Sequence, residues 1–185
     1  MRFFLLLACL TLVMLGGAKT RNVLVASSSK HLLRALPFNL TLLAGTGGIA
    51  WATMQADEWL GLPSLIHIVG HIIGFLSIAA GLWLRISATA VYYRHEMAVV
   101  RLLPQHSLVT VSPFAHVRNP LLQGWWLLQL GWAVALGTPM GLLLTLVLGL
   151  ILNAWVGWEE LTLTTEFGED YVDYHARAPR WGWRR

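Results

Sequence analysis

The chain contains a single cysteine, Cys9, and little charge, since only 12% of its 185 residues are Asp, Glu, Lys or Arg. One cysteine excludes an intrachain disulfide and a metal site built from several cysteines. Hydrophobic residues make up 56% of the chain, which is more than a soluble domain of this length carries. The net charge of +4 does not indicate nucleic-acid binding, because Lys and Arg are spread among the polar segments. The composition indicates a membrane protein.

Five apolar stretches approach the length needed to cross the roughly 30 Å of a bilayer's hydrocarbon core. They are residues 3–17, 36–54, 62–84, 121–136 and 140–158. Polar segments at 18–35, 55–61 and 85–120 separate the first four, and a short turn joins the last two. We therefore expect an all-α membrane protein of about five transmembrane helices, with residues 1–185 forming a single membrane domain.

The distribution of basic residues predicts the orientation. If all five stretches span, Arg2 is the only one of the 13 Lys and Arg residues on its side. The positive-inside tendency then places segment 85–120 and the C-terminal tail in the cytoplasm. The first stretch also fits a cleaved signal peptide. We favour a retained helix, because cleavage would leave the basic residues of the next loop on the translocated side.

The tail becomes polar from Glu159 onward, while four larger residues recur at steps of three or four: Leu163, Phe167, Tyr171 and Tyr174. This spacing predicts an amphipathic C-terminal helix with these side chains on one face. We expect Gly168 to break or bend it. Beyond it, Arg180 and Trp181 suit a position in the headgroup layer.

Polar groups gather at two places where predicted helices meet the cytoplasmic face. At the first, Pro120 suits the first turn of a helix, because its missing N–H costs nothing there, and Asn119 can cap that helix. Amide donors at the helix start, with Arg118 beside them, favour an anionic group such as a carboxylate or a phosphate. The alternative is that Arg118 is only a topology signal.

At the second place, Glu159 and Glu160 follow Trp155 and Trp158 at the end of the stretch 140–158. Adjacent helical residues point about 100° apart, so we expect one carboxylate to bind a ligand and the other to support it. A carboxylate at a helix C-terminus is unfavourable for the helix dipole, which speaks against a purely stabilising role. The alternative is a solvated acidic pair at the start of the amphipathic helix.

His67 and His71 lie four residues apart in the third stretch, hence on one face of a helix. Two ligands are too few for a metal or haem site, so we expect hydrogen bonds between helices or a place in the cavity wall, and no metal. We expect Trp125, Trp126 and Trp132 to belong to the membrane interface and to helix packing.

Two ordered motifs flank the predicted helical hairpin. The first, over residues 108–124, reads LVT-x-S-P-F-x-x-V-R-N-P-x-x-x-G, and the second begins at Glu159-Glu160 and continues through Phe167-Gly168 to Pro179-Arg180. Together they resemble the isoprenylcysteine carboxyl methyltransferase and phospholipid methyltransferase family. The resemblance implies an enzyme that uses S-adenosylmethionine in a cytoplasmic cofactor pocket and takes a lipidic substrate from the bilayer. Residues 105–181 would form this core, with residues 1–104 as N-terminal helices and connector.

The resemblance also implies roles for single residues. The implied cofactor contacts are His106, Ser107, Leu108, Val109, Phe114, Arg118, Asn119, Pro120, Leu122, Gly124, Glu159 and Glu160. Candidates for a catalytic role are Arg118, Glu160 and His116, the last as a proton acceptor. Asn153 and Trp155 are the candidates for substrate binding, because they precede the Glu pair where the family often has an arginine.

The chain departs from the family pattern at three positions. Asn119 replaces a common His, Leu122 a common Tyr, and Ser112 a common Gly. The acceptor would be a carboxyl, amine or thiol of a lipidic or small amphipathic molecule. Two alternatives stay open: an NADPH-dependent membrane reductase, since sterol reductases share the arginine and proline motif, and a non-catalytic membrane binding protein. The sequence does not indicate an oligomeric state.

Overall fold

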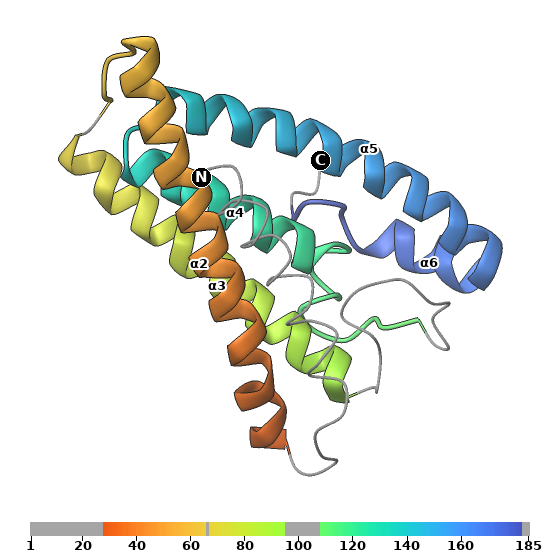
Figure 1. Cartoon of the computed structure of the whole chain (residues 1–185). Helices are drawn as coiled ribbons and strands as arrows, with labels where there is room; N and C mark the ends of the chain where they lie inside the picture. The colour runs from red at the N-terminus through yellow and green to blue at the C-terminus, as the bar shows by residue number, and fades with distance from the viewer. Residues whose placement is uncertain (1–27, 66, 95–107, 183–185) are drawn as a thin grey trace.

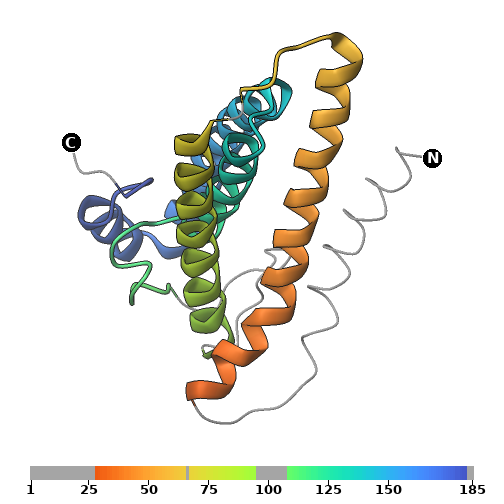
Figure 2. The same cartoon turned by 90° about the vertical axis from the view of Figure 1, so that its left-hand side faces the viewer.

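The computed structural model describes residues 28–65, 67–94 and 108–182. These residues form five helices and no strand: α2 (Ser28–Leu60), α3 (Ile68–Arg94), α4 (Pro120–Ala135), α5 (Pro139–Phe167) and α6 (Glu169–Arg177) (Figure 1). The prediction of an all-α protein is confirmed. Helix α4 contacts both α3 and α5, and Figure 2 shows these three helices with α2 on one side of them and α6 on the other.

The helices α3 and α4 pack with their backbones in close contact, because glycines line both sides of the interface. A Cβ atom on Gly74 would lie 2.6 Å from Gly131 O, and one on Gly81 would lie 2.7 Å from Gly124 O. Small residues of this kind let membrane helices approach closely enough for extensive van der Waals contact. This interface is the central packing contact of the fold.

Two of the described helices, α3 and α5, are long and apolar enough to cross a membrane. With 29 residues, α5 is about 43 Å long, so it exceeds a hydrocarbon core of roughly 30 Å by about two turns. Large apolar side chains point outward along both helices, among them Ile72, Phe75, Leu76, Leu146, Leu150 and Ile151. The predicted stretch 3–17 lies outside the described residues, and the full set of five spans stays a prediction.

The helices extend further into polar sequence than predicted. Helix α2 includes residues 55–60 and α3 includes residues 85–94, which were expected to be loops. Helix α5 continues without a break through residues 159–167, which were expected to begin the amphipathic C-terminal helix. Polar residues such as Glu, Gln and Arg are good helix formers, so a loss of hydropathy does not end a helix. At its other end, α3 is shorter than predicted, because it begins at Ile68 and not at Leu62.

His67 therefore lies just before α3 and not within it. Its carbonyl accepts a hydrogen bond from the His71 N–H, and its Nδ1 accepts one from the Val69 N–H at 3.3 Å. Both contacts are local. Within the described part of the chain, no group of three or more His, Cys, Asp or Glu side chains is placed to hold a metal ion.

The turn between α4 and α5 is fixed by polar contacts with the end of α2. Asp57 accepts a hydrogen bond from the Met140 N–H at 2.9 Å, which caps the beginning of α5 from a neighbouring helix. The hydroxyl groups of Thr53 and Thr138 are 3.1 Å apart, and Thr138 also caps α5 through the Gly141 N–H. The opposite end of this hairpin carries the predicted motifs.

Candidate functional site

An ion pair joins the beginning of α4 to the end of α5. Arg118 lies two residues before α4, and its Nη2 atom is 3.0 Å from Glu160 Oε1. The two side chains are only 7% and 10% exposed, so the pair is buried. Close contact of this kind is needed because burial removes both charges from water, at a cost that their attraction must offset. The two polar motifs of the sequence therefore come together in one site.

The local sequence explains where α4 begins but not how it is capped. Pro120 occupies the first helical position, as predicted. Asn119 is at the N-cap position, but its side chain makes no capping hydrogen bond, which corrects the expectation. Its ψ of 57° departs from the extended conformation that brings an N-cap side chain over the first turn. Its carbonyl accepts instead from the Gln123 N–H at 2.9 Å.

Arg118 is also bound to the C-terminal part of the chain. Its backbone N–H donates to Pro179 O at 2.9 Å, and its Nη1 donates to His175 O at 3.1 Å. Its Nε atom is buried and has no hydrogen-bond partner. An unpaired donor on a buried guanidinium is unfavourable unless a ligand or a water accepts from it.

Arg180 contacts the same carboxylate from the other side. It pairs with Glu160 Oε2, its Nε donates to Glu160 Oε1 at 3.2 Å, and its Nη1 donates to Asn153 Oδ1 at 3.2 Å. The Trp181 indole also donates to Asn153 Oδ1, at 3.1 Å. These contacts tie residues 178–182 to α5, and the headgroup position of Arg180 and Trp181 stays a prediction. Asn153, expected to bind substrate, anchors this segment.

Gln123 belongs to the site although the sequence analysis passed over it. Its Nε2 donates to Trp181 O at 3.3 Å, while its Oε1 is buried and has no hydrogen-bond partner. Gly182 lies beside it in a left-handed conformation (φ 78°), and a Cβ there would be 3.6 Å from Gln123 Nε2. The sequence signal was an amide near the beginning of a largely apolar helix.

Helix α6 packs against the loop that precedes α4. Tyr171 and Tyr174 are buried and cluster with Leu163, Phe167 and Leu108. The predicted shared face is confirmed, although it belongs to two helices, because Gly168 ends α5 with a φ of 55°. The Tyr174 hydroxyl donates to Phe114 O at 2.8 Å. Helix α6 thus holds the loop in place.

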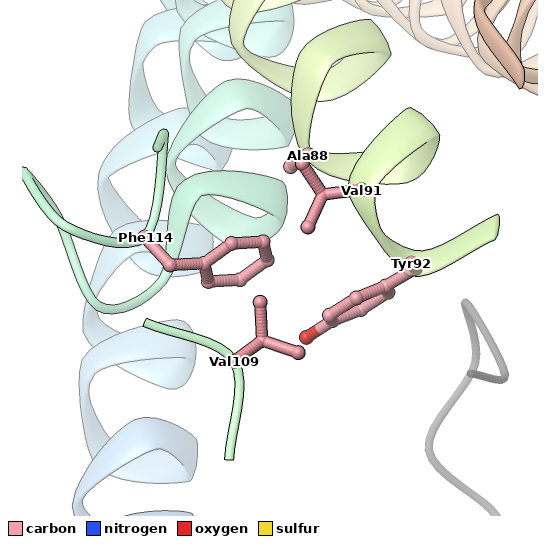
Figure 3. Close-up of a cluster of buried hydrophobic side chains, with 5 residues drawn as sticks. All are labelled: Ala88, Val91, Tyr92, Val109 and Phe114. Carbon is pink, nitrogen blue, oxygen red and sulfur yellow. The ribbon is translucent and has the colours of Figure 1, made fainter. Parts of the chain in front are cut away.

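Phe114 is part of a compact hydrophobic cluster at the end of α3. Figure 3 shows its ring directed towards Ala88, Val91 and Tyr92 of α3, with Val109 beside it. The rings of Phe114 and Tyr92 are stacked, with their centroids 5.1 Å apart and an angle of 21° between their planes. One face of Phe114 is therefore covered by Tyr92, which the sequence analysis did not single out.

Comparison with known proteins identifies the family. The sequence profile of the phospholipid methyltransferases matches residues 69–170, which is more than half of the chain. The chain belongs to the phospholipid methyltransferase family. This is a family of integral membrane methyltransferases that use S-adenosylmethionine.

Two mammalian relatives of this family are similar to parts of the chain. The mouse protein-S-isoprenylcysteine O-methyltransferase is 28% identical over 134 residues, covering 71% of this chain and 44% of the mouse protein. The rat protein-S-isoprenylcysteine O-methyltransferase is 35% identical over 75 residues, covering 40% of this chain and 26% of the rat protein. The chain thus spans less than half the length of these curated relatives. No solved structure matches it.

Other residues implied by the family motifs have diverse surroundings. His106 and Ser107 lie outside the described residues. Gly124 faces α3, where a Cβ would be 2.7 Å from Gly81 O, so helix packing alone requires a glycine there. His116 is exposed, and so is Trp155 on the outer face of α5. Glu159 is half-buried, whereas Glu160 is buried in the ion pairs described above.

The tryptophans of α4 pack within the helical bundle. The Trp126 indole donates to Thr145 O at 3.0 Å, and Trp132 lies against Gly47 of α2. Trp125 and Trp132 join a cluster with Leu42 and Leu128. Their predicted role in packing is confirmed.

Proposed function

We propose that the chain is a membrane-embedded methyltransferase that transfers a methyl group from S-adenosylmethionine to a lipidic or small amphipathic acceptor. The acceptor atom belongs to a carboxyl, amine or thiol group. Family membership supports this reaction class. The single observation that supports its location is the buried ion pair between Arg118 and Glu160, which brings the two family motifs together.

The charges of the site suit a ligand that carries a carboxylate. Two guanidinium groups, those of Arg118 and Arg180, share the one buried carboxylate of Glu160. The cluster therefore has one cation in excess, and Arg118 Nε is buried without an acceptor. A carboxylate satisfies both needs, because it carries negative charge and accepts hydrogen bonds from a guanidinium. The methionine part of S-adenosylmethionine carries such a carboxylate.

The apolar residues next to this cluster suit the remainder of the cofactor. Leu108, Val109 and Phe114 precede Arg118 in the same loop, and Phe114 and Val109 pack against the end of α3. Aromatic and aliphatic side chains are the usual walls for a planar adenine ring. We propose that adenine lies against this loop, with Arg118 at the opposite end of the ligand.

Methyl transfer from S-adenosylmethionine requires little acid–base catalysis by the protein. S-adenosylmethionine supplies an electrophilic methyl group whose transfer leaves a neutral thioether. The residues of the chain must align the acceptor with this methyl group and exclude water. If the acceptor carries a proton, His116 and the Glu pair are the candidates to accept it. Equal single-turnover rates for the wild type and His116→Ala would exclude His116.

We further propose that the site faces the cytoplasm and that the acceptor enters from the bilayer. The excess of Lys and Arg in the segments flanking the site supports this orientation. Trp155 and Trp158, both exposed on α5 close to Glu160, suit the boundary between the hydrocarbon core and the headgroups. A lipidic acceptor would reach the site along this boundary.

Titration of the purified full-length chain in detergent tests the proposal. We expect saturable binding of S-adenosylmethionine and S-adenosylhomocysteine, and none of NADPH. Arg118→Met should weaken the binding of S-adenosylhomocysteine at least about tenfold, because a charge-assisted contact is worth roughly 1.5–3 kcal/mol. Arg177→Met, which removes an exposed arginine of α6, is the charge-matched control.

The outcomes separate the functions that the sequence left open. Binding of NADPH without binding of S-adenosylhomocysteine would replace the methyltransferase by a reductase. Binding of S-adenosylhomocysteine without turnover of any lipid would indicate a non-catalytic binding protein. Lipid profiles of cells with and without the gene, compared for a mass difference of one methyl group, would identify the acceptor.

A further inference from the structure

The proposed function leaves the ammonium group of the cofactor without an assigned partner. An acidic residue is the usual partner, but both oxygens of Glu160 are already engaged by Arg118 and Arg180. The carboxylate of Glu160 therefore has its charge balanced within the protein. An ammonium that approached it would meet two guanidinium groups, which repel it.

A second buried acceptor is available on α4. Gln123 Oε1 is buried and accepts no hydrogen bond. The orientation of this amide is determined by its surroundings, because the atom next to Trp181 O must be the donor, Nε2. A flipped amide would place two acceptors together. The oxygen of Gln123 thus lies beside Gly182 and accepts no hydrogen bond.

The unpaired atoms of Gln123 and Arg118 are complementary to an amino acid. Arg118 Nε is a donor and suits a carboxylate, whereas Gln123 Oε1 is an acceptor and suits an ammonium. Both residues are held by the same C-terminal segment, Arg118 through Pro179 O and Gln123 through Trp181 O. Those two carbonyl groups are two residues apart, hence separated by at most about 7 Å.

Two residues held by one short segment suit the zwitterionic end of the ligand. The ammonium and carboxylate groups of an amino acid share one carbon, and each adds a hydrogen bond of about 3 Å to reach its partner. We infer that Gln123 is a cofactor-binding residue whose Oε1 accepts a hydrogen bond from the ammonium group of S-adenosylmethionine. This inference rests on the proposed function and adds to it a residue at one of the unspecified positions of the motif over residues 108–124.

Two ligands and two variants of the full-length chain test the inference by calorimetric titration. The ligands are S-adenosylhomocysteine and its analogue without the amino group. Gln123→Met keeps the length of the side chain but removes the acceptor. We expect it to weaken the binding of S-adenosylhomocysteine about tenfold and that of the desamino analogue less than about twofold.

Gln129→Met is the matched control, because Gln129 is another amide of α4, about 9 Å further along the helix. It should leave both affinities unchanged. Equal losses for the two ligands in Gln123→Met, or no loss for either, would overturn the inference while the proposed function stands. Failure of the wild type to bind S-adenosylhomocysteine would instead overturn the proposed function, and this inference with it.

Discussion

Arg118 and Glu160 close the α4–α5 hairpin at the end opposite its turn. The turn end is held by Asp57 and the Met140 N–H, whereas the open end is held by the ion pair of 3.0 Å. Two helices fixed at both ends form a rigid support, which a binding site needs for precise geometry. The residues that would hold the cofactor are therefore also residues that hold the fold together.

Glu160→Gln should weaken the binding of S-adenosylhomocysteine at least about tenfold. The variant leaves Arg118 and Arg180 without a counter-charge, so the guanidinium of Arg118 loses its fixed orientation. Loss of one partner from a buried ion pair should also lower the free energy of unfolding by about 3–5 kcal/mol. Titration combined with thermal unfolding in detergent measures both effects.

Glu159→Gln is the matched control for this variant. Glu159 is adjacent in sequence and carries the same charge, but it is only half-buried. We expect less than about a threefold change in affinity, because a partly solvated carboxylate contributes less. A larger loss of affinity in Glu159→Gln than in Glu160→Gln would assign ligand binding to Glu159.

Asn153→Leu tests whether Asn153 anchors the C-terminal segment or binds substrate. The variant removes the acceptor shared by Arg180 and Trp181. Amide hydrogen exchange should therefore become faster at residues 178–182, by about fivefold or more for the loss of roughly 1 kcal/mol of hydrogen bonding. Mass spectrometry of peptides from the labelled protein measures this rate. An unchanged exchange rate together with a raised KM for the acceptor would restore the substrate-binding role.

The sequence predicted those features that depend on local backbone chemistry or on a linear motif. Pro120 begins α4 and Gly168 ends α5 because a fixed φ and a positive φ, respectively, are properties of single residues. Arg118 and the pair Glu159-Glu160 could be assigned to one site in advance because each lies at a motif beside an end of the same hairpin. Residue type and position were sufficient in these cases.

Contacts between distant segments could not be predicted in this way. Arg180 looked like a headgroup anchor because basic and aromatic residues near a membrane usually have that role, yet it pairs with Glu160 and Asn153. Arg85 looked like a loop residue because hydropathy falls there, yet it is buried within α3. The amide of Gln123 is oriented by Trp181 O of the C-terminal segment, which folds back onto it. No periodicity in the sequence carries this information.

Gly131→Ala should destabilise the protein, because the added Cβ would lie 2.7 Å from Gly74 O and 2.8 Å from Ile78 N. Backbone atoms of α3 cannot move aside singly, so α3 and α4 must separate. We expect a loss of about 1–3 kcal/mol, the usual cost of overpacking. Gly157→Ala is the control, since nothing lies within 4 Å of a Cβ there. Helix propensity predicts no loss of stability for it, and a gain of up to about 1 kcal/mol. Equal melting temperatures for the two variants would contradict the close packing of α3 and α4.

Arg85 and Asn39 form a buried polar contact between α3 and α2 whose two single variants should differ. Arg85 Nε donates to Asn39 Oδ1 at 3.0 Å, and its Nη1 donates to Leu121 O of α4 at 2.6 Å. In the part of the chain that the structure describes, no carboxylate pairs with Arg85. The guanidinium is therefore stabilised by neutral acceptors and by the Phe38 ring, 5.5 Å from its central carbon.

Asn39→Leu should be the more damaging change, because it leaves a buried cation with one acceptor fewer, at a cost of at least about 2 kcal/mol. Arg85→Met should be milder, because it removes the charge together with its desolvation cost and leaves only neutral groups unpaired. The loss of stability in the double variant should then be smaller than the sum of the two single losses by at least about 1 kcal/mol. Thermal unfolding of the wild type, the two single variants and the double variant in one detergent gives the double-mutant cycle. Strictly additive losses would show that the contact between Arg85 and Asn39 does not couple α2 to α3.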